Sequence, residues 1–74
     1  MKVPIKMKPL IDTLKTTYGK SNITVEHWSD KEGDAINIIL PLYDCEGNPV
    51  ELHFDMGGRP FDYSYFGLRR YYID

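Results

Sequence analysis

Between Asn22 and Asp55 the chain alternates apolar and polar side chains with a period of two, and this pattern restricts the fold more than any other feature of the sequence. Successive side chains of a β-strand point to opposite faces, so the pattern predicts strands that bury one face. We expect strands over residues 22–28, 35–43 and 49–55. The third strand separates apolar from polar side chains most clearly, with an inward set of Val50, Leu52 and Phe54 and an outward set of Glu51, His53 and Asp55.

Two polar segments separate these strands and predict antiparallel connections. Residues 29–34 read as a turn, and residues 44–48 read as a tight hairpin in which Gly47 supplies a positive φ. Pro41 conflicts with a central second strand because proline cannot donate a hydrogen bond to a sheet. We therefore expect a bulge or a break near Pro41, with the hairpin continuing beyond it.

A helix is predicted from about Pro9 to Tyr18. Apolar side chains recur there at helical spacing, proline suits the first turn of a helix, and Gly19 follows as a C-terminal cap.

The last segment fits two patterns. Phe61, Tyr63 and Tyr65 alternate as in a strand, whereas Phe61, Tyr65, Leu68 and Tyr72 recur as on a helix. We favour a helix over residues 60–73, because Asp62 suits its N-cap and the arginines at 69 and 70 suit its C-terminal end.

The fold class expected is therefore α+β: an N-terminal helix, a three-stranded antiparallel meander and a C-terminal helix, with the helices on one face of the sheet. The 74 residues form one domain, with residues 1–8 flexible. A domain this small has a marginal core. Its single cysteine, Cys45, cannot form an internal disulfide, so an oligomer or a partner is the expected source of added stability.

Charge is divided unevenly along the chain. Residues 1–20 contain five lysines and one aspartate, whereas residues 21–55 contain eight acidic residues and one lysine. The N-terminal segment is therefore basic and the predicted sheet is strongly acidic. Such a sheet repels a phosphate backbone and favours a positively charged protein partner, such as a nucleic-acid-binding protein.

No motif in the sequence predicts catalysis, a metal or a cofactor. Cys45 lies between Asp44 and Glu46, which oppose thiolate formation. His53 with Glu51 and Asp55 has the composition of a cation site or an acid–base cluster, but this spacing is common on a solvated strand face. The chain also lacks a bilayer-length apolar run and a secretory signal, so a cytoplasmic location is expected.

These observations predict a non-enzymatic module that binds another protein through an acidic hairpin surface and an aromatic C-terminal segment. The residues assigned to this surface are Trp28, Asp30, Glu32, Asp34, Tyr43, Asp44, Glu46, Arg69, Arg70, Tyr71 and Tyr72. In size and charge layout, though in no motif, the chain resembles small phage-encoded inhibitors that dock on host or defence proteins. Two alternatives stay open. One is a nucleic-acid-binding accessory protein that uses Arg59, Arg69, Arg70 and the tyrosines, and the other is a small subunit stabilised by oligomerisation.

Overall fold

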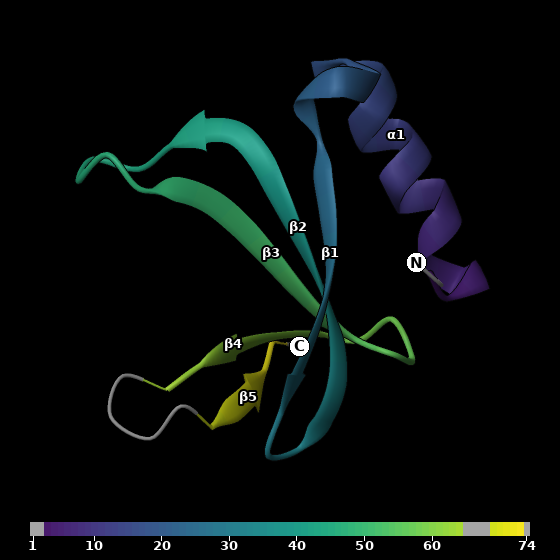
Figure 1. The fold of residues 1–74 in the computed structure, drawn as a ribbon, viewed down its shortest axis with the longest axis vertical. Coiled ribbons are helices and arrows are strands. Elements are labelled where there is room, and N and C mark those ends of the chain that lie inside the picture. The colour runs from purple at the N-terminus through teal and green to yellow at the C-terminus, as the bar shows by residue number, and fades with distance from the viewer. Residues whose placement is uncertain (1–2, 65–68, 74) are drawn as a thin grey trace.

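A computed structural model describes residues 3–64 and 69–73, which form one helix packed on a five-stranded antiparallel sheet. The strands follow one another in the order β1-β2-β3-β4-β5, so each hydrogen-bonds to its neighbour in sequence (Figure 1). The elements are a 3-10 turn Ile5–Met7, α1 Lys8–Tyr18, a second 3-10 turn Lys20–Asn22, β1 Thr24–Asp30, β2 Gly33–Tyr43, β3 Pro49–Asp55, β4 Pro60–Tyr63 and β5 Arg70–Tyr72.

The N-terminal helix confirms the prediction for the start of the chain. Pro9 lies in its first turn, and Gly19 ends it with a φ of 96°, a backbone conformation that favours glycine. Met7 and Ile11 are buried against the sheet. Within the ranges 3–64 and 69–73, no helix has the length and apolar character needed to cross a membrane.

The main core lies between α1 and one face of the sheet. Ile36 and Ile38 of β2 are fully buried at its centre, and side chains from β1 and β3 pack around them. The inward set predicted for β3 is confirmed, because Val50, Leu52 and Phe54 all pack against this core. The period of two therefore identified the face that α1 covers.

The expected irregularity near Pro41 is also confirmed. Regular pairing of β2 with β3 stops at Ile39↔Glu51 and resumes at Tyr43↔Pro49. Three residues of β2, 40–42, thus lie opposite the single residue Val50. A bulge of this kind bends a strand and leaves residues outside the ladder, which accommodates a proline without a lost bond.

The predicted three-stranded sheet with a C-terminal helix is wrong. Residues 60–63 and 70–72 form β4 and β5 instead, with Phe61 opposite Tyr72 and Tyr63 opposite Arg70. The alternation of Phe61 and Tyr63 was the correct pattern, because both rings turn to the same face of the sheet. The helical alternative also depended on Tyr65 and Leu68, which lie outside the described residues.

The second correction concerns the other face of the sheet, which was expected to face solvent. The sheet is strongly curled, so that β4 and β5 approach the turn between β1 and β2 (Figure 1). Ala35 and Asn37 of β2 point to this concave face and are as buried as the main core. The sheet therefore has α1 on one face and its own last two strands on the other.

The difference in burial between the centre and the end of β2 generates a stability prediction. Changing the fully buried Ile38 to Ala should lower the free energy of unfolding by about 2–5 kcal/mol, because it removes core contacts and leaves a cavity. Leu42→Ala is the matched control on the same strand, and since Leu42 is 41% exposed it should change stability by about 0.5 kcal/mol or less. Urea denaturation measures both, and equal losses would contradict the assigned core.

Candidate protein-binding site

One carboxylate, that of Asp30, joins the two ends of the curled sheet. Arg70 of β5 donates from Nε to Asp30 Oδ2 at 2.9 Å, and the Tyr63 hydroxyl donates to the same oxygen at 2.8 Å. Arg70 Nη2 also donates to the carbonyl of Gly33 at 2.6 Å. The Arg70 side chain is only 3% exposed and that of Asp30 is 18% exposed. We call this contact the Asp30 anchor.

Neighbouring groups strengthen the anchor and shift its titration. The hydrogen bond from Arg70 is the largest influence on Asp30 and lowers the pKa of its carboxyl to about 2. The same bond raises the pKa of Arg70. Burial, followed by the contact with Asp30, raises the pKa of Tyr63. Both members of the Asp30–Arg70 ion pair therefore stay charged, and Tyr63 stays a neutral donor, across the neutral range.

Aromatic side chains fill the concave face beside the anchor. The His53 ring lies at the centre, with centroid distances of 5.3 Å to Trp28, 5.8 Å to Phe61 and 5.3 Å to Tyr63. The Arg70 guanidinium lies 4.6 Å from the centroid of the Phe61 ring, in cation–π contact. Aromatic packing of this kind makes a second, smaller core on the face that was expected to be solvated.

A buried amide lies next to this aromatic core. Asn37 is fully buried, and its Nδ2 donates to Glu51 Oε1 at 2.6 Å, with Glu26 Oε1 at 3.5 Å. Asn37 Oδ1 and His53 Nδ1 are buried without a partner among the described residues. The amide thus fixes the carboxylate of Glu51 at the margin of the concave face.

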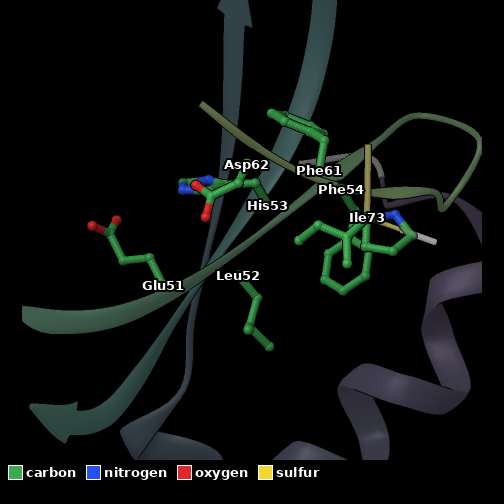
Figure 2. Close-up of a pocket in the computed structure, with 8 residues that line it drawn as sticks. Glu51, Leu52, His53, Phe54, Phe61, Asp62 and Ile73 are labelled. Carbon is green, nitrogen blue, oxygen red and sulfur yellow. The ribbon is translucent and has the colours of Figure 1, made fainter. Parts of the chain in front are cut away.

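Strands β3 and β4 separate at this margin. They pair only at His53↔Phe61 and Phe54↔Pro60, although each strand continues beyond the paired region. A pocket of about 160 Å³ lies where they part, and it is lined by Glu51, Leu52, His53, Phe54, Pro60, Phe61, Asp62 and Ile73. Figure 2 shows Leu52, Phe54 and Ile73 on one side of β3 and Glu51 and His53 on the other. The pocket therefore has an apolar wall and an acidic wall.

The β2–β3 hairpin extends away from the body of the molecule (Figure 1). We call residues 40–50 the arm. Tyr43 is 71% exposed and Leu42 is 41% exposed, and Cys45 at the turn is exposed as well. Asp44 Oδ1 accepts the backbone N–H groups of Glu46 and Asn48, both at 2.9 Å, so it holds the turn together.

The residues predicted to bind a partner fall into two groups at opposite ends of β2, because its two turns lie at opposite ends of the strand. The group near the β1–β2 turn contains Trp28, Asp30, Glu32, Asp34, Arg69, Arg70, Tyr71 and Tyr72. The group on the arm contains Tyr43, Asp44 and Glu46. A single acidic contact surface over both hairpins is therefore not what the fold presents.

Much of the first group is engaged within the protein. Asp30 is bonded as described, Glu32 Oε2 accepts the backbone N–H of Arg70 at 2.7 Å, and Asp34 Oδ1 accepts the Ser29 hydroxyl at 2.5 Å. Trp28 and Tyr72 pack against other rings of the concave face. Tyr71 and Arg69 are exposed. On the arm, the Glu46 carboxylate makes no hydrogen bond or ion pair with any described residue.

The structure does not gather Glu51, His53 and Asp55 around one point. Glu51 binds Asn37, His53 lies under aromatic rings, and Asp55 Oδ1 accepts the backbone N–H groups of Gly57 and Arg59 in the β3–β4 turn, both at 2.9 Å. Burial raises the pKa of Asp55, but the hydrogen bonds from Arg59, Tyr72 and Gly57 outweigh it and leave the pKa lowered. Among residues 3–64 and 69–73, no three metal-binding side chains cluster closely enough to hold an ion.

Comparison of the chain with models of known protein families, with curated proteins and with solved structures finds no match. The candidate site is therefore defined by this chain's own geometry.

Sequence reasoning missed the residues that shape the opening between β3 and β4. Asn37 is the single polar residue among its apolar neighbours in β2, and it lies on the face opposite Ile36 and Ile38. A polar side chain there indicates that the second face of the strand is covered too. Tyr63 and Asp62 were assigned to a helix, so their place beside β3 was not considered.

The anchor generates a prediction about acid stability. Replacing the carboxyl in Asp30→Asn should lower the free energy of unfolding at pH 7 by about 1.5–3 kcal/mol, the usual value of a hydrogen bond to a charged group. The folded-state pKa is about 2 and the ordinary value is 3.8, so the unfolded chain binds the proton first as the pH falls. The stabilisation is therefore complete above about pH 4 and is lost toward pH 2.

Urea denaturation of the wild type and Asp30→Asn at pH 7, 4 and 2 measures this effect. The difference between the two proteins should be largest at pH 7 and should shrink between pH 4 and pH 2. Carboxyls such as Asp55 are present in both proteins and drop out of the difference. A difference that is constant from pH 7 to pH 2 would contradict the anchor.

Proposed function

We propose that this protein is a non-enzymatic module that binds another protein through the arm. The observation that carries the proposal is the exposure of two large apolar side chains, Leu42 and Tyr43, on a hairpin that leaves the body of the molecule. Tyrosine is enriched among residues that dominate binding energies, because its ring buries a large area at a small entropic cost.

The charge of the arm supports a positively charged partner. No lysine or arginine occurs from Glu32 to Gly58, whereas Asp44, Glu46 and Glu51 all lie on or beside the arm. Bonds from backbone N–H groups leave the negative charge of Asp44 in place. The proposed partner is therefore a protein surface with an apolar pocket for Tyr43 inside a rim of lysine or arginine side chains. Such a rim would speed association at low salt.

The other two functions considered are less well supported. Nucleic-acid binding would use Arg59, Arg69 and Arg70, but the Arg70 guanidinium is buried and committed to Asp30 and Gly33, and that of Arg59 lies over the Tyr72 ring. For a subunit stabilised by oligomerisation, the described residues show no surface that would favour a second copy of the chain over another protein.

The arm variants test the proposal. Tyr43→Ala should weaken partner binding at least about 10-fold, since loss of a central tyrosine costs about 2 kcal/mol or more. Tyr71→Ala is the control, because Tyr71 is also exposed, at 52% against 71% for Tyr43, but lies in the other group. The partner is captured on the immobilised wild-type chain from a lysate of the cells that make it, and its affinity for each variant is then measured by calorimetry.

Charge reversal gives an independent test of the same proposal. Glu46→Lys should weaken binding and reduce its dependence on salt, whereas Asp12→Lys on the exposed side of α1 should change neither. A partner that binds Tyr43→Ala and Glu46→Lys as tightly as the wild type would overturn the proposal. So would a partner that is lost only with Tyr71→Ala.

A further inference from the structure

We propose that the opening between β3 and β4 receives an extended segment of the partner, which adds to the free edge of β3 as a further strand and carries alternating apolar and basic side chains. This inference deepens the proposed function and rests on it, because the free edge at Glu51 lies directly beside the arm. It concerns a site separate from the exposed side chains of Leu42 and Tyr43.

The backbone of β3 has hydrogen-bonding groups at this edge that no described residue pairs with. In an antiparallel sheet, alternate residues of a strand face the same neighbour. Asp55 N–H bonds to Arg59 on the β4 side, and His53 pairs with Phe61 on that side, so Glu51 must face β4 as well. No residue of β4 pairs with Glu51. Its N–H and C=O are therefore directed into the opening, as in the sheet edges to which peptides add.

On the opposite side of the opening, the backbone N–H of Tyr63 already has a partner. Tyr63 would be the next partner of Glu51 if the strands stayed together, but its N–H is bonded to Asp62 Oδ1 at 2.9 Å. Its hydroxyl is held by Asp30, on the far side of the concave face. The Asp30 anchor thus draws β4 away from β3 just beyond Phe61, and Asp62 caps the donor that this separation releases. Within the described residues, the free backbone donor at the opening is therefore on β3, at Glu51.

The side chains around the opening specify its occupant. A residue paired with Glu51 would place its side chain on the same face as the Glu51 carboxylate, which Asn37 holds in position. The next residue would point to the opposite face, where Leu52 and Ile73 make the apolar wall (Figure 2). A basic residue opposite Glu51 with apolar residues on either side meets both requirements.

Peptide binding to the free chain tests this. The probe is a fluorescent, end-capped peptide of alternating valine and lysine, and the first control replaces each lysine by glutamate. The second control is N-methylated at the lysine amides, which removes the donors to β3, and the third is N-methylated at the valine amides, which point away from β3. Fluorescence anisotropy should show binding of the parent peptide, at least about 10-fold weaker binding after lysine methylation, and a smaller loss after valine methylation.

Amide hydrogen exchange locates the bound strand. In the free protein, Glu51 N–H should exchange faster than Leu52 N–H, which faces β2. The peptide should slow exchange at Glu51 at least about 10-fold, and Glu51→Gln should weaken binding of the lysine peptide while the protein stays folded. No binding, equal loss for the two methylated peptides, or unchanged exchange at Glu51 would each overturn the inference.

The proposed contact through Tyr43 and the proposed strand addition at Glu51 can be refuted separately. Tyr43→Ala should leave peptide binding unchanged because Tyr43 does not line the opening. Peptide binding that is lost in Tyr43→Ala would show that the edge is not an independent site. A partner that needs Tyr43 but is not displaced by the peptide would refute the strand addition and leave the proposed function intact.

Discussion

The shape of this protein depends on the ion pair between Asp30, at the end of β1, and Arg70, at the start of β5. The two residues are 40 positions apart in sequence, and their contact at 2.9 Å turns a meander into a curled sheet. Tyr63 joins them through the same carboxylate oxygen. The curl covers the second face of β2 and supplies an aromatic core that a flat sheet would lack. For a 74-residue chain without a disulfide, this second core adds to the limited burial under α1.

The same contact explains the features assigned to binding. A strand drawn toward Asp30 cannot stay paired with β3, so β4 leaves β3 beyond Phe61 and no residue of β4 pairs with Glu51. At the other end of β2, the bulge around Pro41 carries the arm away from the body. Apolar and acidic side chains then meet solvent at both places. The same strand order therefore places the curled, covered part of the sheet at one end of β2 and the exposed arm at the other.

The helix, the first three strands and the irregularity at Pro41 could all be predicted, because local periodicity and turn residues determine them. The last two strands could not, since Phe61, Tyr63 and Tyr65 fit strand spacing while Phe61, Tyr65, Leu68 and Tyr72 fit helical spacing in the same short segment. The choice between the two depends on Asp30, which is far away in sequence. For the same reason the acidic residues of the first hairpin were predicted to bind a partner, whereas the fold commits Asp30 and Glu32 to Arg70. Tyr43, Asp44 and Glu46 on the arm kept the exposed setting that the sequence indicated, as did Arg69 and Tyr71 in the other group.

A double-mutant cycle tests the central contact most directly. The free energy of unfolding would be measured at pH 7 for the wild type, Asp30→Asn, Arg70→Gln and the double variant. Groups in direct contact usually show a coupling energy of about 0.5–3 kcal/mol, and the buried, charged geometry here predicts a value in the upper half of that range. Additive losses, with a coupling energy near zero, would mean that β5 is not held to β1 by this pair and would contradict the curled sheet.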